Sequence, residues 1–348
     1  MRHGYRRGLS TDCGAIAAAM AGVGFASGRG VAAFFGQLGW AAWVGIPLAA
    51  IVFALLVGLI GHYARATGAR SFAGIFRRLA GKRLGAAIGG LHALLTLLTA
   101  LAMLACAGEL GALALPVKNA WLWGVGIALM AALAVNADGL RLLPAMGLTA
   151  FALSLSFYVA MALDVRPVRV YLRCETAMAL SGSVGASILL AVLYAALSAC
   201  LAGGMIARSG GASKPGVVAS VCGVGLCAML LCANAALLRG SASILGQAMP
   251  NVILAARWGI AGFWWTVALQ YLCTVASLAA TIGTLIAQLE EGGQERRCVL
   301  ALLPAAALAV AGFRSGGHAR ACGIACLAGA ACVAALACGY DRKSIRRR

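Results

Sequence analysis

The sequence has few charged residues, and acidic ones are scarcest. Only 11% of its 348 residues are charged, with nine Asp and Glu against 28 Lys and Arg. Soluble domains carry about 25% charged residues, so the composition excludes a soluble globular domain. An enzyme would need converging acid and base groups, for which little material exists, so we expect none. The basic residues lie between apolar runs, so we expect lipid headgroups as partners and no nucleic acid.

Cysteine is abundant, but paired metal-binding motifs are missing. Thirteen cysteines are present, most of them inside apolar runs, and no C-x-x-C pair occurs. A metal site also needs polar partners around its ligands, which these runs offer rarely. We therefore predict that the thiols are small packing residues.

Long apolar runs dominate the chain, which is 63% hydrophobic. A membrane span needs about 20 apolar residues, and about ten runs meet this criterion. The predicted spans are 13–36, 40–62, 85–113, 119–137, 142–163, 180–206, 215–238, 259–287, 298–314 and 319–340. Lys and Arg concentrate in the 63–84 loop and in the tails 1–12 and 341–348. Because positive loops stay inside, both tails are predicted to be cytoplasmic in a multi-pass protein of the cell membrane.

Ten spans divide into two sets of five within a single integral membrane domain, about 13–163 and 180–340. Because five is odd, the second set enters the membrane from the opposite side, which predicts an inverted repeat. The spacing of apolar residues in Ser71–Leu79 predicts a short amphipathic helix on the inner surface. The stretch Ile244–Trp258 is predicted to be helical across the outer mouth of a cavity.

The first span contains a glycine cluster that should break its helix. Each mid-helix glycine costs about 1 kcal/mol relative to alanine. Loosened backbone is tolerated in lipid only where it is buried or lines a cavity. The cluster therefore predicts a solute site, with a glycine-lined helix contact as the alternative. The predicted solute-binding residues are Gly22, Gly24, Phe25, Ala26, Ser27, Gly28 and Arg29, together with Tyr194 from the sixth span.

A matching break is predicted in the sixth span. The small residues Ser198–Gly204 are the counterpart expected of an inverted repeat.

The stretch A-G-V-G-F-A-S-G-R-G-V-A-A-F-F-G-Q-L-G, Ala21 to Gly39, resembles the first helix of the YkvI-like membrane proteins. That family is a branch of the amino acid–polyamine–organocation superfamily. Weaker likenesses follow in order at Ala105–Pro116, Asn136–Pro144 and Ala248–Ala255. One departure is Gly30, which stands where the family usually has glutamate.

The resemblance implies an all-α membrane protein of about ten helices, with the LeuT-type 5+5 inverted repeat and broken helices 1 and 6. It also implies symport of a small solute, an amino acid or related amine, coupled to Na⁺ or H⁺. Carbonyls of Gly22 and Val23 with hydroxyls of Thr274 and Ser277 would form the Na⁺ site. No other cofactor is expected. The alternative is that both hydroxyls bond back to their own helix.

Two charged residues within spans have open roles. Arg29 would clamp an anionic solute, close the outer gate, or extend to the interface. Glu109 would pair with Arg29, accept a proton, or stay solvated at the interface.

A solute-sensing receptor on the same fold is the alternative function, since the loss of a carboxylate at Gly30 suits binding without flux.

Overall fold

The computed structural model describes residues 8–21, 27–114, 120–136, 141–164, 182–208, 214–239, 242–245, 247 and 249–291. All regular elements among these residues are helices. The predicted ninth and tenth spans, 298–314 and 319–340, the predicted tail 341–348 and residues 1–7 of the predicted tail 1–12 lie outside the described residues.

The described helices follow the predicted spans closely. They are α1 (Leu9–Met20), α2 (Arg29–Phe34), η2 (Gly36–Ala41), α3 (Ala42–Thr67), α4 (Phe72–Ala80), α5 (Lys82–Ala114), α6 (Ala120–Asn136), α7 (Leu143–Leu163), α8 (Val184–Arg208), α9 (Pro215–Leu238), α10 (Ala242–Leu245), α11 (Pro250–Ala255), η3 (Ala256–Trp258) and α12 (Gly259–Glu291). Within the described part, six helical stretches are long and apolar enough to cross a membrane. The protein is therefore a multi-pass membrane protein.

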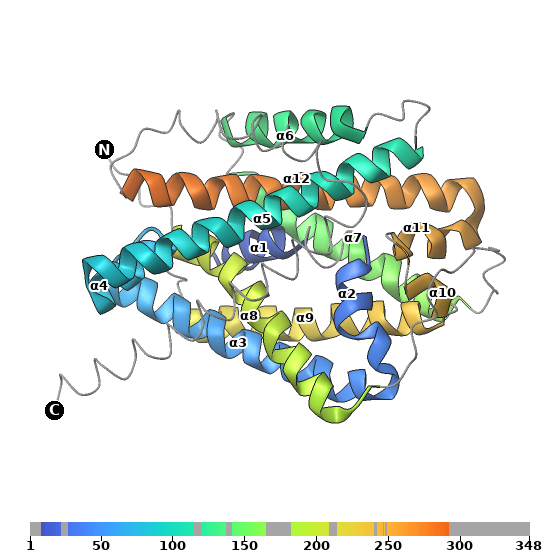
Figure 1. The fold of residues 1–348 in the computed structure, drawn as a ribbon, viewed down its shortest axis with the longest axis horizontal. Helices are drawn as coiled ribbons and strands as arrows, with labels where there is room; N and C mark the ends of the chain where they lie inside the picture. The colour runs from blue at the N-terminus through green and yellow to red at the C-terminus, as the bar shows by residue number, and fades with distance from the viewer. Residues whose placement is uncertain are drawn as a thin grey trace.

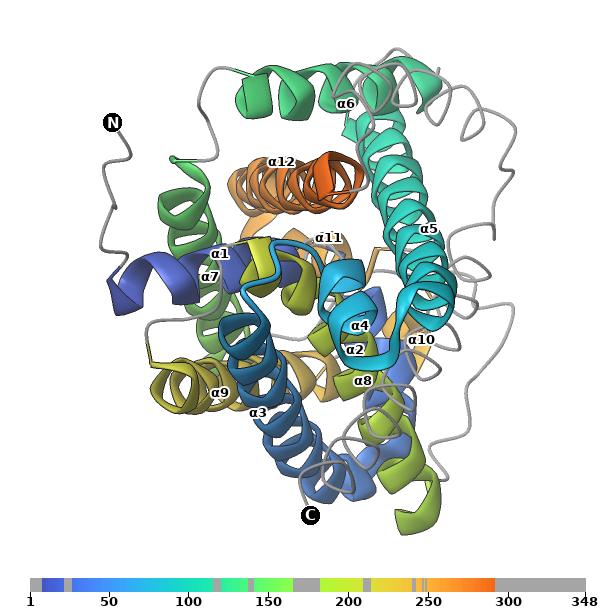
Figure 2. The ribbon, with the colours of Figure 1, turned by 90° about the vertical axis from the view of Figure 1, so that its left-hand side faces the viewer.

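The long helices run side by side along the longest axis of the molecule (Figure 1). Helix α4 lies near one end of this bundle, and α10 and α11 lie near the other. The short α1 lies among the long helices, where it packs against α7, α8, α9 and α12 (Figure 2). An element surrounded in this way must satisfy its backbone within the protein, which is the setting that tolerates a helix break.

The amphipathic helix predicted over 71–79 is α4. The Ser71 side chain caps it by accepting a hydrogen bond from the Gly74 N–H at 2.9 Å. Phe72 and Phe76 are fully buried, and α4 packs against α5. The arginines in its last turn, Arg77 and Arg78, are less buried. The predicted helix over 244–258 is divided into α10, α11 and η3.

Helices α1 and α7 cross at unusually close range because two glycines meet there. A Cβ placed on Gly147 would overlap the carbonyl oxygen of Gly14, and one on Gly14 would overlap the Pro144 carbonyl. Contacts of this kind are typical of helix pairs in membranes. The crossing fixes α1 against α7 two turns before α1 ends.

The break predicted in the sixth span is wrong. Helix α8 continues for 25 residues from Val184 to Arg208. Its small residues serve close packing instead. A Cβ on Gly204 would overlap the Thr284 side chain of α12, and one on Gly203 would approach Phe72 to 3.0 Å.

Candidate functional site

The first span is interrupted, as its glycine cluster predicted. Helix α1 ends at Met20 and α2 begins at Arg29. Gly28 has a φ of 77°, a left-handed conformation that glycine adopts without steric cost. The backbone N–H of Arg29 donates to the Ser27 hydroxyl at 3.3 Å. The predicted site residues Gly22, Val23, Gly24, Phe25 and Ala26 lie outside the described residues.

The α11 segment packs directly onto this interruption. The backbone N–H of Asn251 donates to the Ser27 carbonyl at 3.2 Å. The Asn251 side-chain amide donates to the Tyr158 hydroxyl of α7 at 2.8 Å. Gly28 contacts the same asparagine so closely that a Cβ there would overlap its Oδ1 atom. Ser27, Asn251 and Tyr158 are thus linked at the α11 end of the interruption.

Arg29 also links the interruption to the segment that precedes α11. One of its guanidinium nitrogens, Nη1, donates to the Gln247 carbonyl just before α11, at 2.7 Å. The Glu109 carboxylate of α5 also interacts electrostatically with Arg29. These contacts hold the Arg29 side chain beside the segment that precedes α11, and which of its three predicted roles it has stays a prediction.

On the other side of the interruption, α12 faces the end of α1. The Ser277 hydroxyl donates to the Ala19 carbonyl at 3.0 Å. Thr274, one turn away, donates to the Gln270 carbonyl of its own helix at 2.8 Å. Of the two hydroxyls predicted for a Na⁺ site, Ser277 thus reaches α1, while Thr274 bonds back along its helix.

These hydroxyls belong to a polar stripe that follows the buried face of α12. Its residues recur every three or four positions, which places them on one side of a helix. They are Thr266, Gln270, Thr274, Ser277, Thr281 and Thr284, each no more than 5% exposed. Gln288 continues the stripe to the ring of His92 in α5. Its four threonine hydroxyls donate to carbonyls of their own helix four residues earlier, as the alternative predicted, whereas the Ser277 hydroxyl reaches α1.

Two buried side-chain amides, one in this stripe and one in α9, lack partners among the described residues. Both side-chain polar atoms of Gln270 and of Asn234 in α9 have no hydrogen-bond partner among the described residues. Gln270 is 1% exposed and Asn234 is fully buried. Leaving such a group unpaired costs about 1–3 kcal/mol. Gln270 lies one turn before Thr274 and two turns before Ser277, the residue that contacts the end of α1.

Tyr194, predicted as a wall of the site, belongs to an aromatic cluster beside α2. Its ring meets Phe34 and Phe35 edge-on, each at 5.3 Å between centroids. Tyr194 is 4% exposed. The cluster holds the half-helix that carries Arg29 against α8.

His92 of α5 contacts three other helices, α4, α8 and α12. Its Nε2 atom lies 3.0 Å from the Cys200 carbonyl, so this nitrogen carries the proton and donates. Its Nδ1 atom is 2.5 Å from the Gln288 amide nitrogen. The ring also stacks on Phe72 at 4.3 Å. This matches the helix-contact role that a lone histidine most often has.

The oxygen atoms beside the interruption are ligands that suit a hard cation better than a soft metal ion. In the described part of the chain, no three His, Cys, Asp or Glu side chains gather as a metal site. The Ala19 carbonyl and the Ser277 and Thr274 hydroxyls are neutral oxygen donors. Oxygen ligands are preferred by hard ions.

Sequence reasoning missed Asn251, Tyr158 and Gln270. A signal existed for Gln270, because it lies four and seven residues before Thr274 and Ser277 and so shares their helix face. No such signal existed for Asn251 and Tyr158, which meet only through tertiary packing.

The fold is similar to those of solved transporters. It matches the Eremococcus coleocola manganese transporter, solved with an aromatic bis-isothiourea substituted compound, with a TM-score of 0.59 and 16% identity over 89% of this chain and 71% of that one. It matches MhsT, solved in complex with L-phenylalanine, with a TM-score of 0.62 and 15% identity over 89% of this chain and 80% of that one.

No protein-family model and no curated protein matches the sequence. The YkvI-like resemblance therefore remains a prediction. At such low identities the structural likeness concerns the fold alone, and the chain has the LeuT-type transporter fold.

Proposed function

We propose that the protein is a secondary transporter that moves a small solute, an amino acid or a related amine, using a Na⁺ or H⁺ gradient. The observation that carries the proposal is the interruption of the first span beside the polar stripe of α12. Buried, irregular backbone next to hydroxyls and amides is how secondary transporters hold substrate and ion.

The neutral oxygens of Ala19, Ser277 and Thr274 favour Na⁺ over H⁺ as the coupling ion. A proton site would need a titratable group at this point, and these three donors do not titrate near neutral pH. Predicted solute contacts are Ser27, Gly28 and Tyr194, and Gln270 joins them. MhsT was solved with L-phenylalanine, which supports amino acids as the first solutes to test.

Uptake into proteoliposomes tests this proposal. Labelled amino acids and amines should accumulate under an inward Na⁺ gradient and not without one. A thermal-shift screen with amino acids, amines and purines selects the solutes to measure. Binding without flux under Na⁺ or H⁺ gradients would contradict transport.

The Ser277→Ala variant tests the ion site. It removes the hydroxyl that faces the Ala19 carbonyl, so we expect Na⁺ dependence to weaken at least tenfold, about 1.4 kcal/mol. Ser156→Ala is the matched control, because Ser156 is exposed and bonds to Ala152 of its own helix. Unchanged Na⁺ dependence in Ser277→Ala would rule out this ion site.

A solute-sensing receptor is the second candidate. Helix α8 is unbroken, which removes one of the two hinges expected of this fold. The gap between Ala19, Thr96 and Thr281 also has no room for a water molecule. A receptor would show solute binding with no accumulation, so the same uptake measurement separates the two functions.

A further inference from the structure

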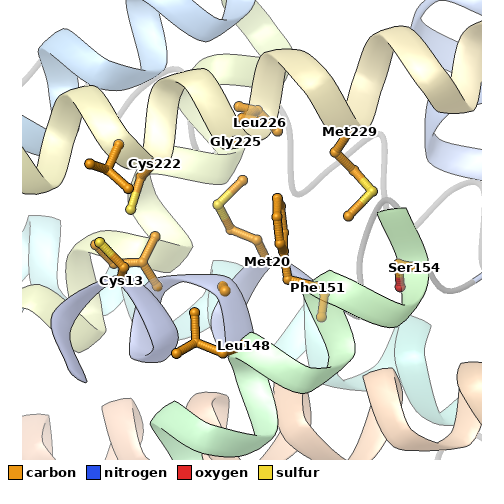
Figure 3. Close-up of a pocket in the computed structure, with 13 residues that line it drawn as sticks. Cys13, Met20, Leu148, Phe151, Ser154, Cys222, Gly225, Leu226 and Met229 are labelled. Atoms are coloured by element: carbon orange, nitrogen blue, oxygen red, sulfur yellow. The ribbon is translucent and has the colours of Figure 1, made fainter. Parts of the chain in front are cut away.

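Two thiols from different helices meet two turns of α1 away from its interruption. Cys13 lies near the start of α1, and Cys222 lies two turns into α9. Both thiols line the same cavity between these helices. In Figure 3 both side chains lie at the same end of a cavity, turned toward each other.

The cavity beside them gives the sulfurs room to move. It measures about 170 Å³ and is bounded by α1, α7 and α9. The thioethers of Met20 and Met229 and the ring of Phe151 also point into it. Cys13 is 8% exposed and Cys222 is half-buried, so a small apolar reagent has access through the Cys222 side.

We propose that Cys13 and Cys222 form a site of reversible thiol oxidation, whose disulfide links α1 to α9. The two side chains already face each other beside open space, so they can move together to form an S–S bond of about 2.05 Å. Each thiol loses one hydrogen, and one sulfur–sulfur bond forms. The two electrons and two protons pass to the oxidant, a low-molecular-weight disulfide that is split into two thiols.

The apolar lining favours a disulfide over a metal at this pair. A bis-thiolate complex of a monovalent ion carries a net negative charge, which is costly in a dry cavity. A disulfide is neutral. Among the described residues no third His, Cys, Asp or Glu ligand joins the two thiols.

The link would restrain the part of α1 that precedes the interruption. In a transporter this segment has to shift against its neighbours to open the α4 end, and a covalent bond to α9 prevents that. This consequence rests on the proposed transport function, whereas the thiol pair itself does not.

The full-length protein in detergent micelles provides the test. It is treated with diamide, an apolar azo oxidant that takes up both hydrogens, and free thiols are blocked with N-ethylmaleimide. Mass spectrometry after digestion should find the Cys13 peptide joined to the Cys222 peptide, and dithiothreitol should separate them. Failure to find this cross-link in the wild type, or Cys13 joined to another cysteine instead, overturns the proposal.

Two variants make the test specific. Cys222→Ala should lose the cross-link, whereas Cys227→Ala should keep it, because Cys227 lies on the same helix and does not line the cavity. Persistence of an oxidised Cys13 in Cys222→Ala would contradict the pairing.

Hydrogen–deuterium exchange tests the restraint without transport. Oxidation should slow exchange across 13–20 in the wild type and leave it unchanged in Cys222→Ala. Where uptake is measurable, oxidation should abolish it and dithiothreitol should restore it. A cross-link that alters neither exchange nor uptake would refute the restraint, while absence of uptake before oxidation would count only against the transport proposal.

Discussion

Gln270 occupies a position that destabilises the protein unless a ligand or water pairs with its amide. It is 1% exposed, and neither polar atom of its side chain has a partner in the described part of the chain. The leucine side chain has a volume similar to that of glutamine and needs no hydrogen-bond partner. We therefore expect Gln270→Leu to raise the stability of the solute-free protein by about 1–3 kcal/mol. The same change should remove the stabilisation that a bound solute provides. Thermal unfolding with and without solute measures both effects.

Gln37→Leu is the matched control for that variant. The Gln37 amide is partly exposed and donates to the Ala33 carbonyl of the preceding turn at 2.6 Å. Its replacement should change stability by no more than about 0.5 kcal/mol and leave the solute effect intact. If Gln270→Leu kept the full solute effect, Gln270 would be no part of the site.

Single residues were predictable where backbone chemistry decided their role. The glycines and serine of the first span predicted an interruption because helix propensity alone disfavours them there. Ser277 and Thr274 required a family resemblance, and the structure brings only Ser277 to α1. Asn251 and Tyr158 are far apart in sequence and meet across α7 and α11, so no local pattern could predict the pair.

At the scale of elements, the crossing of α1 and α7 depends on having no side chain at Gly147. An alanine Cβ there would overlap the Gly14 carbonyl, which is backbone and cannot move cheaply. Gly147→Ala should therefore destabilise the protein by about 1–3 kcal/mol. Gly90→Ala in α5 should instead stabilise it by about 0.5–1 kcal/mol, because nothing lies within 4 Å of its added methyl group. Thermal unfolding of the two variants should give shifts of opposite sign.

The start of α4 allows the contribution of a helix cap to stability to be compared with that of an exposed ion pair. The Ser71 hydroxyl accepts from the Gly74 N–H and donates to the Glu291 carboxylate of α12. Ser71→Ala should cost about 1–2 kcal/mol, because it removes a helix cap and a tie to α12. Arg78 pairs with the same carboxylate at 3.9 Å but is 50% exposed, and such pairs contribute at most about 1 kcal/mol. Chemical unfolding should rank Ser71→Ala as the more damaging change, and the reverse order would show that the ion pair dominates.

In helix α8, amino-acid composition alone could not predict whether the helix is broken. Its cluster of small residues has the same composition as a helix break and as a close helix contact. Which of the two forms depends on the neighbouring helix, and here Thr284 and Phe72 fill the space beside Gly204 and Gly203. By contrast, span positions were predictable because apolar length alone decides which segments can cross a membrane.

At the scale of the whole molecule, α11 and the segment before it bond to the interrupted first span. Two hydrogen bonds hold α11 and its preceding segment to the interrupted span, Asn251 to Ser27 and Arg29 to Gln247, and a third holds Asn251 to Tyr158 of α7. Only the third depends on a side-chain hydroxyl, so it can be removed with little other change. Opening at this end would expose the interruption and the start of the α12 stripe together.

Tyr158→Phe should shift the molecule toward the open form at the α11 end. The change deletes the buried hydroxyl that accepts from the Asn251 amide, and losing this buried hydrogen bond costs the arrangement at the α11 end about 1–3 kcal/mol. Hydrogen–deuterium exchange should accelerate across 27–34 and 249–255 and stay unchanged across 215–230. Tyr271→Phe removes a hydroxyl that donates to Ala107 of α5 at 3.3 Å, so it should not reproduce this pattern. Equal exchange at the α11 end in both variants would mean that the Asn251–Tyr158 bond does not control closure.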